Sequence, residues 1–185
     1  MANIDFPRGL QVYGNCIRAT QYKLTSNYAQ DLFIGDPVIN ANTGYVTIAT
    51  AGSTNAILGA IIGIYDLNEV PLQYWDTGHT GVGYVLVADS PEQLFVAQGD
   101  GDTTYLDFAD RGGNINLNSG SGSTVNYLSG WELDDSATAG SDANAQVRLI
   151  KPVPVEGNGI GTANCDWIIR INNHQAGAGI VGAGI

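Results

Sequence analysis

Short β-branched and aromatic runs, separated by clusters of Gly, Asn, Asp, Ser and Thr, dominate the chain. No long stretch carries apolar residues at positions i, i+3, i+4 and i+7, which is the pattern of an amphipathic helix. We therefore expect an all-β protein with a single antiparallel β-sandwich or β-barrel domain. Residues 104–109 could form a short helix or strand, and 114–126 are expected to form a loop. The expected strands are 10–18, 21–24, 37–39, 45–50, 58–64, 72–75, 83–88, 93–98, 128–133, 145–152 and 166–172.

Glycines and one turn sequence refine this picture. Asn42-Thr43-Gly44 separates two expected strands, and a glycine with positive φ in such a place is typical of a tight hairpin. Gly59 and Gly63 lie on the same face of one expected strand, which indicates a bulge or the close approach of another backbone. The run Trp167-Ile-Ile-Arg-Ile has apolar residues on both faces, so the last expected strand should be buried or central.

No linker divides the chain, so residues 11–174 are expected to form one β domain between two arms. The N-terminal arm is residues 1–10. The C-terminal arm, residues 175–185, has four glycines, one polar residue and no charged side chain. Glycine loses the most backbone freedom on ordering and alanine buries little surface, so such a segment does not order by itself. We expect a neighbouring subunit to hold it, which indicates a component of an assembly.

Composition and charge limit the partners. Charged residues make up 14% of the 185 residues, and 18 acidic against seven basic residues give a net charge of -11. Because contact with nucleic-acid phosphates requires Lys and Arg, direct nucleic-acid binding is not expected. Residues 1–8 lack the features of a signal peptide, and the longest apolar stretch, 56–65, is too short to span a bilayer. We expect a soluble protein, made in the cytoplasm, that does not contact a membrane.

The sequence offers little catalytic machinery. Nucleophilic catalysis needs a nucleophile, a base and an orienting group, and only His79 and His174 could serve as histidine bases. His79 lies in a turn-like stretch where an exposed loop histidine is favoured. His174 follows the last expected strand, where a structural or interface role is favoured. The sequence has no Gly-x-Ser-x-Gly elbow and no phosphate-binding loop. We therefore expect a protein that is not an enzyme and has no cofactor.

Two groups of carboxylates are the remaining candidates for chemistry. The first could meet around a cation such as Ca²⁺, although its spacing does not match an EF-hand loop. It consists of Asp100, Asp102, Asp107 and Asp110. The second follows Trp131, and paired carboxylates beside an aromatic ring can hydrolyse glycosides. It consists of Glu132, Asp134 and Asp135. Exposed acidic loops are the favoured interpretation of both groups, so neither a metal site nor a catalytic residue is predicted.

Cysteines and most aromatic residues are expected to be structural. Cys16 and Cys165 are interpreted as two separate buried thiols, and a disulfide between them stays open because spacing alone cannot show it. Tryptophans within expected strands are assigned to the core by default. They are Trp75, Trp131 and Trp167. Tyrosines near the N-terminus could lie at subunit contacts, where a buried ring with a wet hydroxyl is favoured. They are Tyr13, Tyr22 and Tyr28.

Five segments, in their order along the chain, carry a family resemblance. They are Met1-Ala-Asn-Ile-Asp-Phe-Pro-Arg-Gly-Leu10, Leu32-Phe-Ile-Gly-Asp-Pro-Val38, Tyr84-Val-Leu-Val-Ala-Asp89, Leu128-Ser-Gly-Trp-Glu-Leu133 and Trp167-Ile-Ile-Arg-Ile-Asn-Asn-His174. Together they resemble a family of tailed-bacteriophage virion proteins, the head decoration or cement proteins, from Met1 to His174. Residues 175–185 depart from the family's pattern and resemble an added arm.

The resemblance implies a non-enzymatic protein of the virion that binds the outside of an assembled capsid. Such proteins lie across contacts between copies of the major capsid protein, often as dimers or trimers, and stabilise the shell. We expect both arms to make these contacts. The contact residues would be Phe6, Pro7, Arg8 and Leu10 in the first arm and Ile180, Val181 and Ile185 in the second. The alternatives are a tail, neck or fibre-base component, or a carbohydrate-binding module that uses Trp75 or Tyr74.

Overall fold

The computed structural model describes residues 3–41, 43–52, 56–102, 104–136 and 139–177. In these ranges the protein is built of short strands, with one 3₁₀ helix, η1 (Phe108–Asp110). The all-β prediction is therefore confirmed. No helix within the same ranges is long and apolar enough to cross a membrane.

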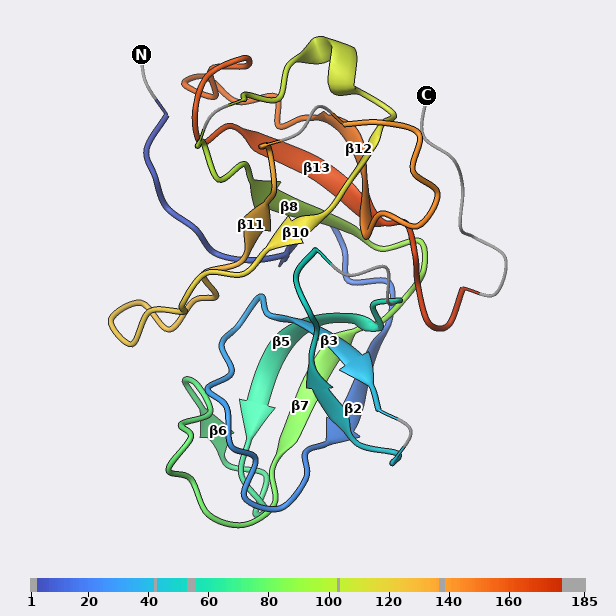
Figure 1. The fold of residues 1–185 in the computed structure, drawn as a ribbon. Helices are drawn as coiled ribbons and strands as arrows, with labels where there is room; N and C mark the ends of the chain where they lie inside the picture. Colours follow the sequence, from blue (N-terminus) through green and yellow to red (C-terminus); the bar gives the residue numbers. More distant parts are fainter. Residues whose placement is uncertain (1–2, 42, 53–55, 103, 137–138, 178–185) are drawn as a thin grey trace.

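Two antiparallel sheets, A and B, form the body of the molecule, and Figure 1 shows sheet A above sheet B. The order in sheet A is β1 (Gln11–Val12), β8 (Leu94–Gln98), β13 (Asp166–Ile171), β12 (Val147–Pro152) and β9 (Asn114–Ile115). The order in sheet B is β2 (Ala19–Lys23), β7 (Tyr84–Ala88), β5 (Gly59–Tyr65), β3 (Pro37–Asn40) and β4 (Val46–Ile48), with β6 (Pro71–Leu72) paired to β5. A two-stranded sheet pairs β10 (Leu117–Asn118) with β11 (Glu132–Leu133).

The chain visits the two sheets in an interrupted order. Strand β1 pairs with β8 in sheet A, yet the whole of sheet B, residues 19–88, lies between them in the sequence. The chain therefore crosses between the sheets twice, just before β2 and just after β7. Arg18 lies in the first crossing and Asp89 in the second. The guanidinium of Arg18 lies 2.7 Å from the carboxylate of Asp89, so this ion pair connects the two crossing segments. Nearby, the amide of Ile17 donates to Gln93 at 2.8 Å.

Two hydrophobic clusters hold this arrangement together, and strand β5 contributes to both. Successive side chains of a strand point to opposite faces. Ala60 accordingly packs in a cluster with Phe95 and Trp167 of sheet A, whereas Ile61 packs in a second cluster with Trp75. Because the first cluster draws side chains from both sheets, the sheets form one sandwich-like unit.

Strand β13 confirms the prediction of a buried last strand. It lies between β8 and β12 in the middle of sheet A, and Trp167, Ile168 and Ile169 are all fully buried. The predicted hairpin is also present, since β3 pairs with β4 and Gly44 has a φ of 80°. Asn42 of that turn lies outside the described residues.

Two local predictions need correction, and one open alternative is decided. The strand predicted at 10–18 is wrong, because only Gln11–Val12 is a strand and Gly14, with φ at 75°, lies where the chain leaves sheet A. The loop predicted at 114–126 contains β9 and β10, which pair with the distant strands β12 and β11. Segments this short have no periodic pattern of their own, so only their partners make them strands. At 104–109, where a short helix or a strand was open, the 3₁₀ helix η1 begins at Phe108 and continues to Asp110, and a capping box between Asp107 and Asp110 marks its start.

The cysteines do not form a disulfide. Cys165 is buried and Cys16 is exposed, and both are free thiols. The prediction of two buried thiols is therefore correct for Cys165 alone. Its sulfur lies 3.1 Å from the indole nitrogen of Trp167, and burial raises the pKa of the thiol to about 11. Cys165 thus acts as a small core residue and as a weak hydrogen-bond acceptor.

The two glycines of β5 lie where the strand meets close neighbours, as the sequence indicates. A Cβ atom on Gly59 would lie 2.2 Å from the backbone oxygen of Ala88 in β7. A Cβ atom on Gly63 would lie 3.1 Å from the hydroxyl of Tyr65, and the register with β7 shifts between Ile61 and Gly63. Gly59 therefore marks a close backbone approach, and Gly63 marks a bulge.

We expect Gly59→Ala to lower the free energy of unfolding by about 1–3 kcal/mol, because its methyl group forces β5 away from β7. Gly63→Ala is the matched control, since its nearest neighbour is the movable end of a side chain. Urea unfolding of both variants measures the difference. Equal stability of the two variants would contradict the close approach at Gly59.

Candidate functional site

The N-terminal segment lies along the chain's own domain and is held there by two amide side chains. Asn3 donates to the backbone oxygens of Gly159 and Ala163 at 2.9 and 2.8 Å and accepts from the amide of Gly159 at 2.7 Å. Gln98, at the end of β8 and only 4% exposed, accepts from the amide of Phe6 at 2.8 Å and donates to the oxygen of Ile4 at 3.1 Å. These hydrogen bonds hold the N-terminal segment against the domain at Asn3, Ile4 and Phe6.

Next along the segment, the chain enters the core. Arg8 forms a half-buried ion pair with Asp166 at 2.7 Å, and Pro7 is half-buried beside it. The amide of Leu10 donates to the oxygen of Gly35 at 2.9 Å, and the Leu10 side chain is fully buried in the cluster shared by the two sheets. The expectation that Leu10 contacts a partner is therefore wrong at the level of its side chain, which stabilises its own domain.

Apolar side chains of the N-terminal segment remain at the surface. Ile4 is 80% exposed and Phe6 is 45% exposed, and across from them Val155 is 57% exposed. All three line an open hollow of about 500 Å³, whose lining also includes Gln98 and Asp166. We call Ile4, Phe6 and Val155 the N-arm surface. The backbones of Ile4 and Phe6 are fixed by their hydrogen bonds to Gln98, so these two side chains are presented by an ordered support.

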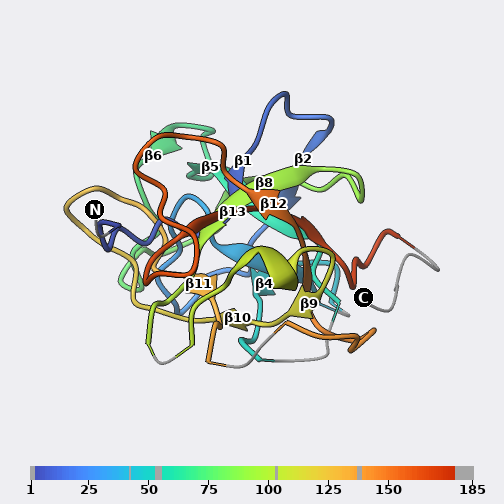
Figure 2. The same cartoon turned by 90° about the horizontal axis from the view of Figure 1, so that it is seen from above.

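The C-terminal segment begins against sheet B. The amide of Gln175 donates to the oxygen of Ile57 at 2.9 Å, and its side chain accepts from the amide of Asn40 at 2.6 Å. In Figures 1 and 2 the last described residues lie on the opposite side of the molecule from the N-terminal segment. The predicted contact residues Ile180, Val181 and Ile185 lie outside the described residues.

The two aromatic residues considered for a sugar site, Trp75 and Tyr74, differ in exposure. Trp75 is fully buried, and its indole nitrogen donates to the oxygen of Tyr28 at 3.1 Å, so it cannot serve as the exposed ring of a carbohydrate-binding module. Tyr74 is half-buried and stacks on Phe33 and Tyr127, with ring centroids 5.3 and 5.8 Å away. The core assignment of the tryptophans is confirmed, since Trp131 and Trp167 are also buried.

The two histidines have structural surroundings. His79 is half-buried, with its ring 4.3 Å from that of Trp75, and so is less exposed than the sequence indicates. His174 is 4% exposed, and its Nδ1 accepts from the amide of Ala176 at 3.0 Å. Burial lowers the pKa of His174, which favours the neutral ring. Both histidines are accordingly placed to support turns.

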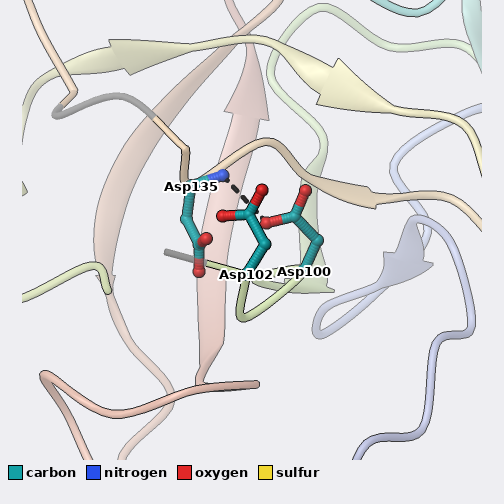
Figure 3. Close-up of side chains that lie close together, drawn as sticks. All are labelled: Asp100, Asp102 and Asp135. Carbon is teal, nitrogen blue, oxygen red and sulfur yellow. Dashed lines mark hydrogen bonds between the residues drawn. The ribbon is translucent and has the colours of Figure 1, made fainter. Parts of the chain in front are cut away.

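Three carboxylates from the two predicted acidic groups meet at one end of sheet A (Figure 3). Asp100 and Asp102 belong to the turn after β8, and Asp135 follows β11; one ligand atom of each lies within 4.8 Å of the others. The sequence grouping is therefore corrected, since Asp107 and Asp110 instead bond within and beside η1. The members of this acidic cluster are brought together by contact between two segments that are distant in the sequence, and the spacing of acidic residues does not reveal such a contact.

Backbone contacts explain how the acidic cluster is assembled. The amide of Asp100 donates to the oxygen of Leu133 at 3.0 Å, which joins the two segments directly. The amide of Asp135 then donates to the carboxylate of Asp100 at 3.2 Å, and the amide of Gly101 donates to that of Asp135 at 3.1 Å. Gly101 has a φ of 69°, a conformation that returns the chain so that Asp102 faces the same point.

The electrostatics of the acidic cluster are unfavourable for negative charge. Burial, followed by the neighbouring Asp100, raises the pKa of Asp135 to about 8. Burial, followed by the charges of Asp5 and Asp100, raises the pKa of the adjacent Glu132 to about 7. Trp131, which precedes Glu132 in the chain, is 3% exposed, so its own ring is not open beside these carboxylates.

Comparison with known proteins found no relative of this chain. No family model, no curated protein and no solved structure matches the chain.

Proposed function

We propose that the protein is a non-enzymatic virion component that binds the outside of an assembled phage capsid and stabilises contacts between subunits of the major capsid protein. The observation that carries this proposal is the N-arm surface, an exposed apolar patch on a hydrogen-bonded support. The resemblance of the five sequence segments to decoration proteins supplies the identity of the partner.

The physical character of the N-arm surface suits a contact between proteins. Ile4 is mostly exposed and Phe6 is about half exposed, yet hydrogen bonds to Gln98 fix the backbones of both. Little conformational entropy is therefore lost when a partner covers these side chains. Burying one such side chain contributes about 1.5–3 kcal/mol. Arg8 and Asp166 at the edge of the hollow provide a polar border.

A lattice of identical sites increases the effect of such a small surface. Copies that contact neighbouring capsid subunits, or each other as dimers or trimers, bind with a high effective concentration. Since the protein binds the assembled shell and not its separated subunits, it stabilises the assembled state by mass action. The net charge of -11 favours a place on the exterior, away from the packaged DNA.

We expect Ile4→Ser combined with Phe6→Ser to weaken binding to capsids at least about tenfold, because about 1.4 kcal/mol corresponds to a factor of ten. The matched control is Leu67→Ser, which removes a 58% exposed side chain from the loop between β5 and β6. Co-sedimentation with capsids of the encoding phage, assembled without this protein, measures the affinity of each.

Full decoration by the double variant would show that the N-arm surface is not the contact. Failure of the unchanged protein to bind would reject the capsid proposal as a whole. A map of the whole particle then locates the protein: density on the tail, neck or fibre base would replace the capsid by that assembly.

A further inference from the structure

The acidic cluster has the dimensions of a cation site. Its members come from two segments that are far apart in the sequence, and Figure 3 shows their carboxylates beside one another, with that of Asp102 drawn between the other two. One oxygen from each of Asp100, Asp102 and Asp135 lies within 4.8 Å of the others. Oxygen ligands of Ca²⁺ lie about 2.3–2.6 Å from the ion, so ligands on opposite sides are about 5 Å apart. Oxygens no farther apart than this can bind one Ca²⁺ together without separation of the two segments.

A second observation points to a ligand at the same place. Asp135 has no exposed surface, and its Oδ1 atom is buried without a hydrogen-bond partner among the described residues. Its other oxygen accepts from the amide of Gly101. A buried carboxylate oxygen with no partner is strongly unfavourable, because it has lost its water and gained nothing in exchange. A cation bonded to Oδ1 would supply the missing interaction.

The remaining oxygens of the cluster are oriented as metal ligands commonly are. Asp100 accepts from the side chain of Asn118 at 2.9 Å through Oδ2 and from the amide of Asp135 at 3.2 Å through Oδ1. Such outer bonds fix the direction of a ligand while leaving lone pairs for an ion. Asp102 is exposed, so the site opens to solvent on that side and an ion can enter and retain water molecules.

We propose that Asp100, Asp102 and Asp135 bind one Ca²⁺ ion, which joins the turn after β8 to the segment after β11. Ca²⁺ accepts irregular sets of carboxylate and water oxygens, whereas Mg²⁺ demands an octahedral set and gives up its water reluctantly. A bound ion would stabilise the turn after β8. Asp100 in this turn lies two residues after Gln98, whose side chain holds the N-terminal segment by hydrogen bonds. This inference does not depend on what the N-arm surface binds.

The test is calorimetric titration of CaCl₂ into the full-length protein after treatment with a chelator. We expect a single site with a Kd between about 10 μM and 1 mM, and a melting temperature that rises with Ca²⁺. MgCl₂ at the same concentration should have a smaller effect on the melting temperature. No detectable Ca²⁺ binding would overturn the proposal, and equal stabilisation by Mg²⁺ would overturn the choice of Ca²⁺.

Two variants assign the site to these residues. Asp102→Asn changes an exposed position and should fold normally, yet weaken Ca²⁺ binding at least about tenfold. Asp135→Asn should abolish the Ca²⁺-dependent rise in melting temperature, and without Ca²⁺ it should be no less stable than the unchanged protein. The matched control is Glu69→Gln, an exposed acidic residue in the loop between β5 and β6. Unchanged Ca²⁺ affinity in Asp102→Asn would place the ion elsewhere and overturn the assignment.

Discussion

Trp167→Ala is expected to lower the free energy of unfolding by about 3–5 kcal/mol, a large part of the 5–15 kcal/mol that is usual for a domain. Trp167 is fully buried near the start of the central strand β13, and its neighbours across the sheet are Ala97 and Pro152. Because strands hold it on both sides, the cavity cannot close by a simple movement of a loop. The indole also donates to Cys165, and that bond is lost as well.

The same substitution tests whether the two sheets unfold together. The cluster around Trp167 includes Ala60 and Ala88 of sheet B, so damage in sheet A should weaken sheet B too. Guanidinium unfolding, followed in parallel by near-UV circular dichroism and by far-UV circular dichroism, should give coincident single transitions at a lower midpoint. The matched control is Phe108→Ala, which removes a 71% exposed ring and should change stability by less than about 0.5 kcal/mol. Two separate transitions would contradict the single domain expected at 11–174.

The free energy of unfolding is expected to decrease as the pH rises from about 4 to about 6, because of Asp36. This residue precedes β3 and is 2% exposed, and burial raises the pKa of its carboxyl from 3.8 to about 6. Hydrogen bonds from the side chain of Ser129 and the amide of Phe33 oppose this rise and only partly offset it. In this pH range the folded protein keeps a proton that the unfolded chain has released, so increasing the pH favours unfolding.

Asp36→Asn isolates this effect from that of the other carboxylates. Asparagine keeps an acceptor for the amide of Phe33 but carries no charge at any pH. The variant should match the unchanged protein near pH 4 and exceed it near pH 7 by about 3 kcal/mol, since one pKa unit corresponds to about 1.4 kcal/mol. Urea unfolding at several pH values, with Glu69→Gln as the control for an exposed carboxylate, measures both curves. Parallel curves for Asp36→Asn and the unchanged protein would rule out a buried, protonated Asp36.

The site residues show where sequence reasoning reaches its limit. Phe6 and Leu10 are both predicted as contact residues, yet Phe6 is 45% exposed whereas Leu10, four residues later, lies in the core. Both are apolar residues in a segment without clear periodicity, so nothing local distinguishes their environments. In the same way, Asp100 and Asp102 form part of an acidic cluster whose third member, Asp135, is supplied by another segment. Such a pairing leaves no trace in spacing.

The sequence by itself determined the all-β class, most of the strands, the turn at Gly44, a bulge or close approach at the glycines of β5 and the burial of the strand around Trp167. These features depend on the alternation of side chains along a strand and on the conformational freedom of glycine, which are properties of neighbouring residues. Only the tertiary structure decided that β1 returns to pair with β8 across all of sheet B, that Leu10 is buried and that Asp100 meets Asp135. Those outcomes depend on how segments that are distant in the sequence pack to bury apolar area. That packing is a property of the whole chain, so no local pattern predicts it.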